Sequence, residues 1–193
     1  MKFECAQRAT PLDSDEITGL IPLHITNQSQ LNEWEAANIL KAENWLFPKS
    51  HGNFLTINFI KLLHEKMFND TWTWAGKFRT TERNIGVRPV KITTDLNNLL
   101  EDVRYQIIHE SFPIDEIAYR FHHRLVAIHS FPNGNGRHAR LMTDLLLAQA
   151  GQPRFTWGKQ KLEAEGAMRN QYITALRNAD KQDYSALAEF VRS

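Results

Sequence analysis

The stretch from His129 to Arg140, HSFPNGNGRHAR, constrains this chain more than any other segment. Apolar residues at helical spacing precede it and the nearly all-apolar LMTDLLLAQA follows it, so it joins two predicted helices. The proline, asparagines and glycines at 132–136 cannot continue a helix comfortably. We therefore expect a loop there, followed by a helix that starts near Asn135 or Gly136.

The start of this second helix is typical of an anion-binding site. Glycines let backbone N–H groups turn inward, and the free N–H groups and positive dipole end of a helix attract anions. Arg137 and Arg140 are three residues apart, so they share one face of the first turn. Arginine forks pair with phosphate oxygens. The loop is therefore predicted to hold phosphate groups.

His129 ends the preceding apolar stripe and faces the same loop. Histidine titrates near neutral pH and is the most common general base. A base beside a polyphosphate suggests deprotonation of a hydroxyl group that attacks phosphorus. The alternative is a plain connecting loop beside a histidine that caps or packs. The combined spacing of His129, Gly-Asn-Gly and the two arginines favours the phosphate site.

The whole chain predicts a mostly α protein. Helices are expected at 28–46, from a cap at Thr56 to about 68, from 94 to 108, after Pro113, from about 135 to a stop at Gly151, and at about 161–178 and 183–192. We expect a lead-in over 1–27 and a single domain over 28–193.

One segment, about 76–92, has β-branched residues, glycines and a proline without a helical period. This pattern favours a short β-hairpin. Its arginines, Arg79, Arg83 and Arg88, are expected to be solvated, with contacts to an acidic target or to phosphates as the alternative.

Composition excludes several classes of protein. The 193 residues carry a net charge of +1, which provides no general basic field for nucleic acid. The single cysteine, Cys5, excludes a disulfide framework. No apolar run reaches the roughly 18 residues of a membrane span, and the N-terminus lacks the apolar region of a signal peptide. We expect a cytoplasmic protein with no nucleic-acid or membrane partner.

The central segment resembles the signature of Fic-domain proteins, HxFx(D/E)GNGRxxR. Seven of the eight defining positions agree, namely His129, Phe131, Gly134, Asn135, Gly136, Arg137 and Arg140. The resemblance covers roughly residues 30–190. The pattern of NEWEAANI and HSFPNGNGRHARL looks closest to the branch of the Fic/DOC family called mobile mystery protein B.

The resemblance implies an all-α helical bundle with a β-hairpin flap, and an enzyme that transfers AMP from ATP to a Ser, Thr or Tyr hydroxyl of a target protein with Mg²⁺. His129 would be the base, and Phe131 an anchor for the loop. Gly134, Asn135 and Gly136 would line the phosphate cradle. Arg137 would bind the β- and γ-phosphates and Arg140 the γ-phosphate.

The resemblance also bears on the target and on the group transferred. The flap at about 76–92 would hold a target segment by strand-like pairing. The Doc branch has lysine at the position of Gly136 and acts as a kinase, so Gly136 favours nucleotidyl transfer. Transfer of another group, such as UMP or phosphocholine, remains an alternative.

Asn133 departs from the signature, which has Asp or Glu there as the Mg²⁺ ligand. Asparagine keeps an oxygen donor but lacks the charge that Mg²⁺ prefers. We expect weaker metal affinity, with ATP supplying most of the binding. The alternative function is a catalytically weak or inactive Fic fold that binds a nucleotide or a partner.

Many Fic proteins are restrained by a helix with the pattern (S/T)xxxE(G/N), whose glutamate pairs with the second arginine of the motif. Ser29 and Glu33 match the first part of this pattern, and Trp34 breaks the last position. Glu35 is the other candidate, and both glutamates are alternatively solvated surface charges. If neither acts, a separate antitoxin-like protein would supply the glutamate to a toxin-like enzyme.

Overall fold

The computed structural model describes residues 19–158 and 165–193, and within them the predicted all-α class is confirmed. The helices are α2 (Gln28–Leu46), α3 (Ile57–Phe68), the short 3₁₀ helix η1 (Pro89–Lys91), α4 (Ile92–Ile108), α5 (Ile114–Ile128), α6 (Asn135–Gln149), α7 (Glu165–Ala179) and α8 (Ser185–Arg192). Residues 1–18 of the predicted lead-in, with Cys5, and the predicted start of the helix at 161 lie outside the described residues. The division into a lead-in and one domain stays a prediction.

Local capping signals explain several helix boundaries. The Thr56 hydroxyl accepts a hydrogen bond from the backbone N–H of Phe59 at 3.1 Å, which satisfies one free donor at the start of α3. Asn27 caps α2 in the same way, through Gln30 N–H at 3.0 Å. Gly151 follows α6 in a left-handed conformation (φ 71°) that favours glycine. Side-chain chemistry near the boundaries therefore sets where these helices begin and end.

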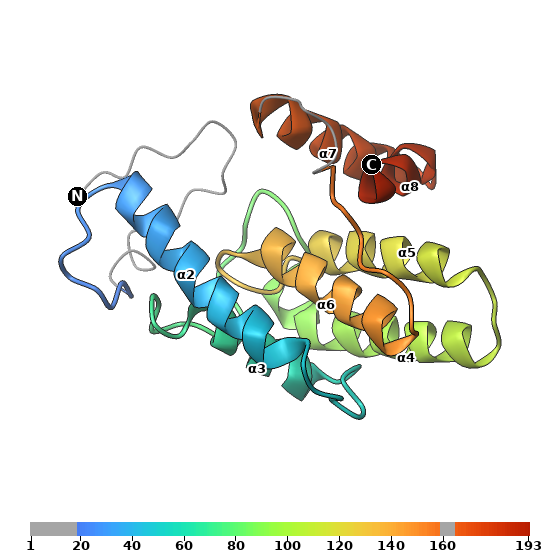
Figure 1. The fold of residues 1–193 in the computed structure, drawn as a ribbon, viewed down its shortest axis with the longest axis horizontal. Helices are drawn as coiled ribbons and strands as arrows, with labels where there is room; N and C mark the ends of the chain where they lie inside the picture. The colour runs from blue at the N-terminus through green and yellow to red at the C-terminus, as the bar shows by residue number, and fades with distance from the viewer. Residues whose placement is uncertain (1–18, 159–164) are drawn as a thin grey trace.

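The helices form a layered bundle around α5 and α6, which lie side by side (Figure 1). The α2–α3 pair packs on one side, α4 lies along α5, and the α7–α8 pair covers α5 from the other side. The fully buried core comes mostly from α3, α4, α5 and α6, with a few residues from α2, α7 and α8; its members include Leu46, Leu63, Met67, Phe68, Leu96, Phe121, Met142, Leu147, Ala179 and Leu187. This packing brings the 129–134 connection between α5 and α6 next to α2 and α7.

The β-hairpin predicted at 76–92 is not formed. In the parts of the chain that the structure describes, the only strand-like pairing is the isolated antiparallel bridge between Leu20 and Trp72. The two arms of the segment pair instead with the end of α5: Arg79 N–H donates to the carbonyl of Ser130 at 3.0 Å, and Val87 N–H donates to that of Ile128 at 3.2 Å. The hydrogen bonds that a hairpin needs are therefore used elsewhere. We call residues 76–88 the flap segment.

Within residues 19–158 and 165–193, no helix combines the length and apolar character that crossing a membrane requires.

The cap at Thr56 yields a prediction about stability. We expect Thr56→Ala to lower the free energy of unfolding by about 1 kcal/mol, because the N–H of Phe59 loses its acceptor. Urea denaturation followed by circular dichroism measures this change. Thr94→Ala, at an exposed position on α4, is the matched control and should change stability by less than about 0.5 kcal/mol. Equal losses in the two variants would contradict the role of the cap.

Candidate active site

His129 lies at the C-terminal end of α5 in a left-handed backbone conformation, with φ 53° and ψ 59°. A residue other than glycine in this region stores strain on the order of 1 kcal/mol, and such strain concentrates at functional sites. The side chain is only 6% exposed. The carbonyl of Val126 lies close enough to the ring to favour its protonated form, and beyond that carbonyl the ring nitrogens have no hydrogen-bond partner among the described residues.

The surroundings of His129 keep its ring neutral. Burial, followed by the charges of Arg79 and Arg83, lowers the pKa of His129 from 6.5 to about 4. Both effects act on the charged form, since a protonated ring would lose hydration and meet two cations. At neutral pH the imidazole is therefore unprotonated, which is the form that accepts a proton from a substrate.

The loop after His129 is closed by the side chain of Asn135. Its Oδ1 accepts from the backbone N–H of Phe131 at 2.9 Å, and its Nδ2 donates to the carbonyl of Phe131 at 2.7 Å. Asn135 is buried, so these two bonds fix the loop without competition from water. The amide side chain, predicted to line the phosphate cradle, is thus used within the loop. Only the backbone N–H of Asn135 remains for a ligand.

Gly134 is the cap residue before α6 and has φ 76°. A Cβ atom at this position would lie 2.5 Å from Cζ of Phe68, so both conformation and space require glycine. Since glycine has no side chain, no side-chain cap satisfies the first N–H groups of α6 among the described residues. This helix end is therefore open to an anion.

Arg137 extends from the first turn of α6 and forms an ion pair with Glu35 of α2, at 2.8 Å between Nη1 and Oε2. The other carboxylate oxygen of Glu35 accepts from Trp72 Nε1 at 2.7 Å. Glu35 is 4% exposed, whereas Glu33 is exposed and accepts a hydrogen bond from Ser29 at 3.4 Å. Of the two candidate glutamates, Glu35 reaches the motif. It pairs with Arg137, the first arginine of the motif. The resemblance had indicated the second arginine, Arg140.

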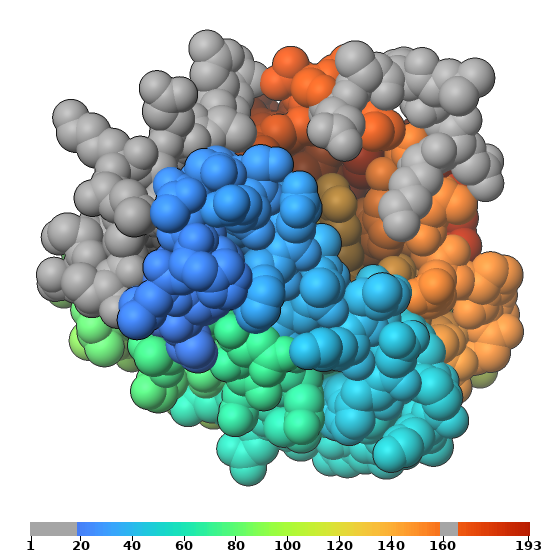
Figure 2. Space-filling view, turned by 60° about the vertical axis from the view of Figure 1, so that its left-hand side comes forward, coloured from blue at the N-terminus to red at the C-terminus, as the bar shows by residue number. Residues whose placement is uncertain are grey.

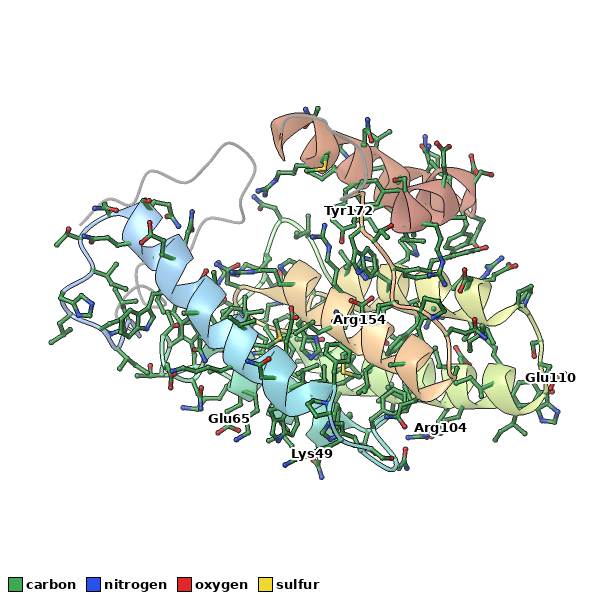
Figure 3. The ribbon with its side chains drawn as sticks, viewed as in Figure 1. Lys49, Glu65, Arg104, Glu110, Arg154 and Tyr172 are labelled. Atoms are coloured by element: carbon green, nitrogen blue, oxygen red, sulfur yellow. The ribbon has the colours of Figure 1, made fainter. Side chains whose placement is uncertain are left out.

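Arg140 has different neighbours. Its guanidinium lies over the rings of Tyr172, at 4.8 Å, and Trp157, at 5.5 Å, and it makes no ion pair within residues 19–158 and 165–193. Tyr172 points from α7 toward α5 and α6 (Figure 3), and its hydroxyl lies 2.8 Å from Nε2 of His122. A Cβ atom at Gly136 would lie 3.8 Å from the same hydroxyl. Arg140 therefore lies against aromatic rings and has no carboxylate partner among the described residues.

These side chains surround one recess. Figure 2 shows the surface hollowed between α2, in blue, and α7, in orange-red, with ochre atoms from around residue 130 at its floor. The predicted residues His129, Gly134, Gly136, Arg137 and Arg140 all come from the connection between α5 and α6 and the first turns of α6. Glu35 approaches from α2 and Tyr172 from α7.

Arg79 corrects the expectation that the arginines of the flap segment are solvated. Its side chain is 3% exposed and donates to the carbonyls of His129 at 2.6 Å and Thr81 at 2.9 Å. It also donates to the carbonyl of Val87. These acceptors are main-chain groups that would otherwise be buried without partners, so the arginine is drawn inside. Arg88, in contrast, is exposed and lies 3.5 Å from Glu82.

Asn133 is the candidate for a magnesium ligand. Its Oδ1 accepts from the N–H of Gly134 at 2.6 Å, and its carbonyl lies 3.1 Å from Nε2 of His64. In the described part of the chain, no three His, Cys, Asp or Glu side chains gather closely enough to hold a metal ion. One neutral, already engaged oxygen does not make a Mg²⁺ site, which needs several oxygens and favours carboxylates. The chain's own residues therefore do not fit this ion without further ligands.

Comparison with known proteins identifies the family to which the segment around this site is similar. The family model described as "Fic/DOC family" matches residues 54–147, which include the whole 129–140 motif. Residues 54–147 belong to the Fic/DOC family. A relative named "Protein adenylyltransferase Fic", from Drosophila grimshawi, is 31% identical over 121 residues, which is 61% of this chain and 23% of that protein. The chain spans about a quarter of the length of the curated relatives it matches.

Solved structures of Fic domains share the fold. The N-terminal Fic domain of a putative cell filamentation protein from Bartonella quintana has a TM-score of 0.72 at 17% identity, covering 89% of this chain and 84% of that one. BepC from Bartonella tribocorum, solved with bound AMPPNP, has a TM-score of 0.67 at 19% identity, covering 93% and 97%. At these identities the likeness concerns the Fic fold. The closer likeness to the mobile mystery protein B branch stays a prediction.

The Fic motif did not disclose every residue at this site. His64 is buried in α3, its Nδ1 accepts from the N–H of Gly76 at 3.0 Å, and its ring stacks on Phe131 with centroids 3.7 Å apart. Tyr172 was likewise visible only as part of a predicted helix. Neither residue belongs to a spaced motif, so the sequence offers no signal for its position. The signal for Glu35 was present, since Leu31, Asn38 and Ala42 share its buried helix face.

The buried histidines predict how the stability of this Fic fold depends on pH. Burial lowers the pKa of His64 well below 6.5, and lowers those of His122, His129 and His138 to about 3, 4 and 4. Between pH 6.5 and 4 the unfolded chain binds protons that the folded chain excludes. Asp144, whose pKa is raised by burial to about 6, acts in the opposite direction but is one group against four.

We therefore expect the free energy of unfolding to be highest above pH 6.5 and to fall steadily as the pH drops toward 4. Urea denaturation at pH 7.5, 6 and 5 measures this slope. His122→Gln should make the slope shallower, because one proton-excluding group is removed. Stability that stays constant or rises over this range would contradict the neutral, buried state of these rings.

Proposed function

We propose that this protein transfers AMP from ATP to a hydroxyl group of a target protein. The observation that carries the proposal is the unpartnered His129 ring beside an uncapped helix end whose first turns bear Arg137 and Arg140. A neutral base and an anion-binding helix end are the two parts that attack on a nucleotide phosphate requires. Names of relatives, "Protein adenylyltransferase Fic" among them, support the same reaction.

In the proposed step the target hydroxyl oxygen attacks the α-phosphorus of ATP. The hydroxyl proton moves to a ring nitrogen of His129, and the bond between the α-phosphorus and its bridging oxygen breaks. AMP is then esterified to the target and pyrophosphate leaves. With a pKa of about 4, His129 is unprotonated at neutral pH and its ring nitrogen is free to take the proton. Phosphate charge beside the ring would raise this pKa toward the neutral range that suits a general base. His129 is the catalytic residue in this scheme.

The triphosphate would lie on the N-terminal end of α6. The backbone N–H groups of Asn135 and Gly136 would contact its oxygens, and Gly134 keeps the approach free of a Cβ atom. Arg137 and Arg140 would neutralise the outer phosphates, as their forks suit phosphate oxygens. Gly136 places no side chain in this space, in agreement with nucleotidyl rather than phosphoryl transfer.

Mg²⁺ is proposed to arrive with the nucleotide. The amide oxygen of Asn133 already accepts from the N–H of Gly134, so the phosphates would supply most of the ligands. Bound in that way, the ion would compensate charge on the phosphates. A target segment is proposed to dock along the flap segment, and the modified residue would be Ser, Thr or Tyr.

Glu35 is proposed to restrain the enzyme from within. Its carboxylate neutralises Arg137 at 2.8 Å and is oriented by Trp72, so a phosphate must displace it to reach the arginine. Displacement leaves a buried carboxylate with one hydrogen bond fewer, which costs free energy. Because Glu35 belongs to the chain itself, inhibition from within is our first proposal for how this protein is controlled. Inhibition by a separate antitoxin-like protein is the second.

A nucleotide-binding module without turnover is the alternative function. It is favoured by one observation, the neutral and engaged Asn133 where a carboxylate would hold the metal. The two functions differ in whether label from the α-phosphate of ATP becomes attached to protein.

The central prediction concerns Glu35 and His129. In a lysate with Mg²⁺ and ATP labelled at the α-phosphate, Glu35→Gln should transfer label about tenfold faster than the unmodified protein. Its amide no longer neutralises Arg137, and a hydrogen bond between a buried carboxylate and this partly exposed guanidinium is worth about 1.4 kcal/mol. Adding His129→Ala should lower transfer by at least about 10²-fold, because the base is lost.

Glu33→Gln is the matched control, since it removes the same charge from an exposed position on the same helix. It should leave transfer unchanged. Equal activation by both glutamate variants, or full transfer by the His129→Ala protein, would rule out this mechanism. Mass spectrometry of the product identifies the transferred group as AMP, UMP or phosphocholine.

A further prediction concerns the metal. Asn133→Asp should lower the Mg²⁺ concentration needed for half-maximal transfer by about tenfold, because a carboxylate adds a full charge. The rate at saturating Mg²⁺ should change less than this concentration does. Transfer in the Asn133→Asp protein that shows the same Mg²⁺ dependence as the unmodified protein would exclude Asn133 from the metal's surroundings.

A further inference from the structure

The flap segment is attached to the end of α5 and not folded on itself. Its outgoing arm donates from Arg79 N–H to the carbonyl of Ser130, at 3.0 Å, and its returning arm donates from Val87 N–H to that of Ile128, at 3.2 Å. The two arms thus lie on the main chain that carries His129. Among the described residues, no backbone hydrogen bond joins the two arms directly, so any link between them is made by side chains.

That junction is the guanidinium of Arg79. It donates to Thr81 and Val87 within the flap segment and to the carbonyl of His129 at 2.6 Å, and its Nη2 lies 3.5 Å from the carbonyl of Ile128. The carbonyls of Ile128 and His129 belong to the C-terminal end of α5, where helix geometry leaves acceptors unpaired and the dipole is negative. A single arginine therefore closes the flap segment and caps this helix.

The returning arm passes directly over the base. Gly86 has φ 94°, and a Cβ atom there would lie 2.6 Å from Cβ of His129 and 2.8 Å from Nη2 of Arg79. Any side chain at this position would push the arm away from both. The contact between flap segment and base is therefore a close main-chain approach that only glycine permits.

We propose that Arg79 is a positioning residue for group transfer: its guanidinium replaces hairpin pairing and holds the flap segment, and with it a docked target, in register with His129. The inference rests on the proposed function for its consequence, although the contacts themselves do not. A target hydroxyl must meet the base at hydrogen-bond distance, and a misplacement of about 1 Å can cost roughly 10²-fold in rate.

The charge of Arg79 has a second effect on the same ring. After burial it is the largest cause of the low pKa of His129; Arg83, also on the flap segment, acts in the same direction, and the carbonyl of Val126 in α5 acts in the opposite one. Arginine stays protonated at any pH at which the protein is folded. The residue that positions the flap segment therefore also keeps the base neutral.

Two substitutions separate the effect of the several N–H donors of the Arg79 guanidinium from the effect of its positive charge. Arg79→Lys keeps a cation but cannot reach several carbonyls at once, whereas Arg79→Met removes both. Arg104→Met is the matched control, because Arg104 also donates from a partly buried guanidinium to a carbonyl, that of Leu55, but does so on α4. Circular dichroism and a thermal melt check that each variant is folded.

Three measurements read the outcome. Amide hydrogen exchange at Val87 reports whether the returning arm stays attached. An NMR titration of the His129 ring reports its pKa without any activity. Transfer to a target, measured as kcat/KM in the Glu35→Gln background, reports positioning. Each variant is compared with the protein that carries Glu35→Gln alone, so that the effect of the arginine is measured by itself.

We expect both Arg79 variants to exchange the Val87 amide at least tenfold faster and to lose about 10²-fold in kcat/KM. The pKa of His129 should rise toward 6.5 in Arg79→Met and remain lower in Arg79→Lys. Arg104→Met should change none of the three. Unchanged exchange at Val87, or unchanged kcat/KM, in folded Arg79 variants would overturn the proposal. A His129 pKa that Arg79→Met does not move would refute the second, electrostatic effect of this arginine.

A fourth variant keeps the test decisive if Arg79→Met does not fold. Gly86→Ala keeps the arginine but forces the returning arm away from both His129 and the guanidinium of Arg79, so it should also speed exchange at Val87 and reduce kcat/KM. Slow exchange and full transfer in this variant would refute the close approach. If the unmodified protein and Glu35→Gln transfer nothing, the proposed function fails, while exchange and titration still decide the role of Arg79.

Discussion

The site depends on a small closed ring between the side chain of Asn135 and the backbone of Phe131. Two buried hydrogen bonds turn the chain sharply after α5 and start α6 only a few residues later. The turn fixes the direction in which the N–H groups at the start of α6 point. It also places the ring of Phe131 against His64, whose other contacts include the main chain of Gly76 and Asn133. The flap segment, the loop and α3 are thereby fixed relative to each other.

Charge is distributed unevenly around this fixed loop. Arg137 is neutralised by Glu35, whereas Arg140 lies between aromatic rings without a carboxylate in the described part of the chain. Arginines near the positive end of a helix are unfavourable by a few tenths of a kcal/mol to about 1 kcal/mol each. An anion at the recess would offset both. The folded protein thus carries an electrostatic cost that a bound polyphosphate relieves, and Glu35 supplies part of that relief from within.

Local signals were sufficient for the helices and for the loop, because caps and apolar periodicity act over a few residues. Thr56, Gly151 and the 132–136 segment are of this kind. The hairpin prediction failed because Arg79 bonds to a carbonyl 50 residues away, and no local pattern contains that information. From composition alone, an arginine in a polar segment is expected to be solvated. Arg79 is buried instead, because it donates to carbonyl groups at the end of α5 that would otherwise lack partners.

Glu33 and Glu35 show the same limit in a milder form. They are two residues apart on one helix and therefore point to nearly opposite sides. A match to a sequence pattern favoured Glu33, but the apolar and small residues of α2 place Glu35 on the buried face. Its partner Arg137 lies 102 residues away, so the ion pair itself could be found only from the packed structure.

The central claim is that the loop and the first turn of α6 bind the phosphates of a nucleotide. A crystal structure of the Glu35→Gln protein with a non-hydrolysable ATP analogue tests it most directly. The account predicts the triphosphate on the N–H groups of Asn135 and Gly136, with Arg137 turned away from α2 toward it and the α-phosphate facing His129. A nucleotide bound elsewhere, or a recess that excludes it while Arg137 keeps its contact with residue 35, would contradict the account.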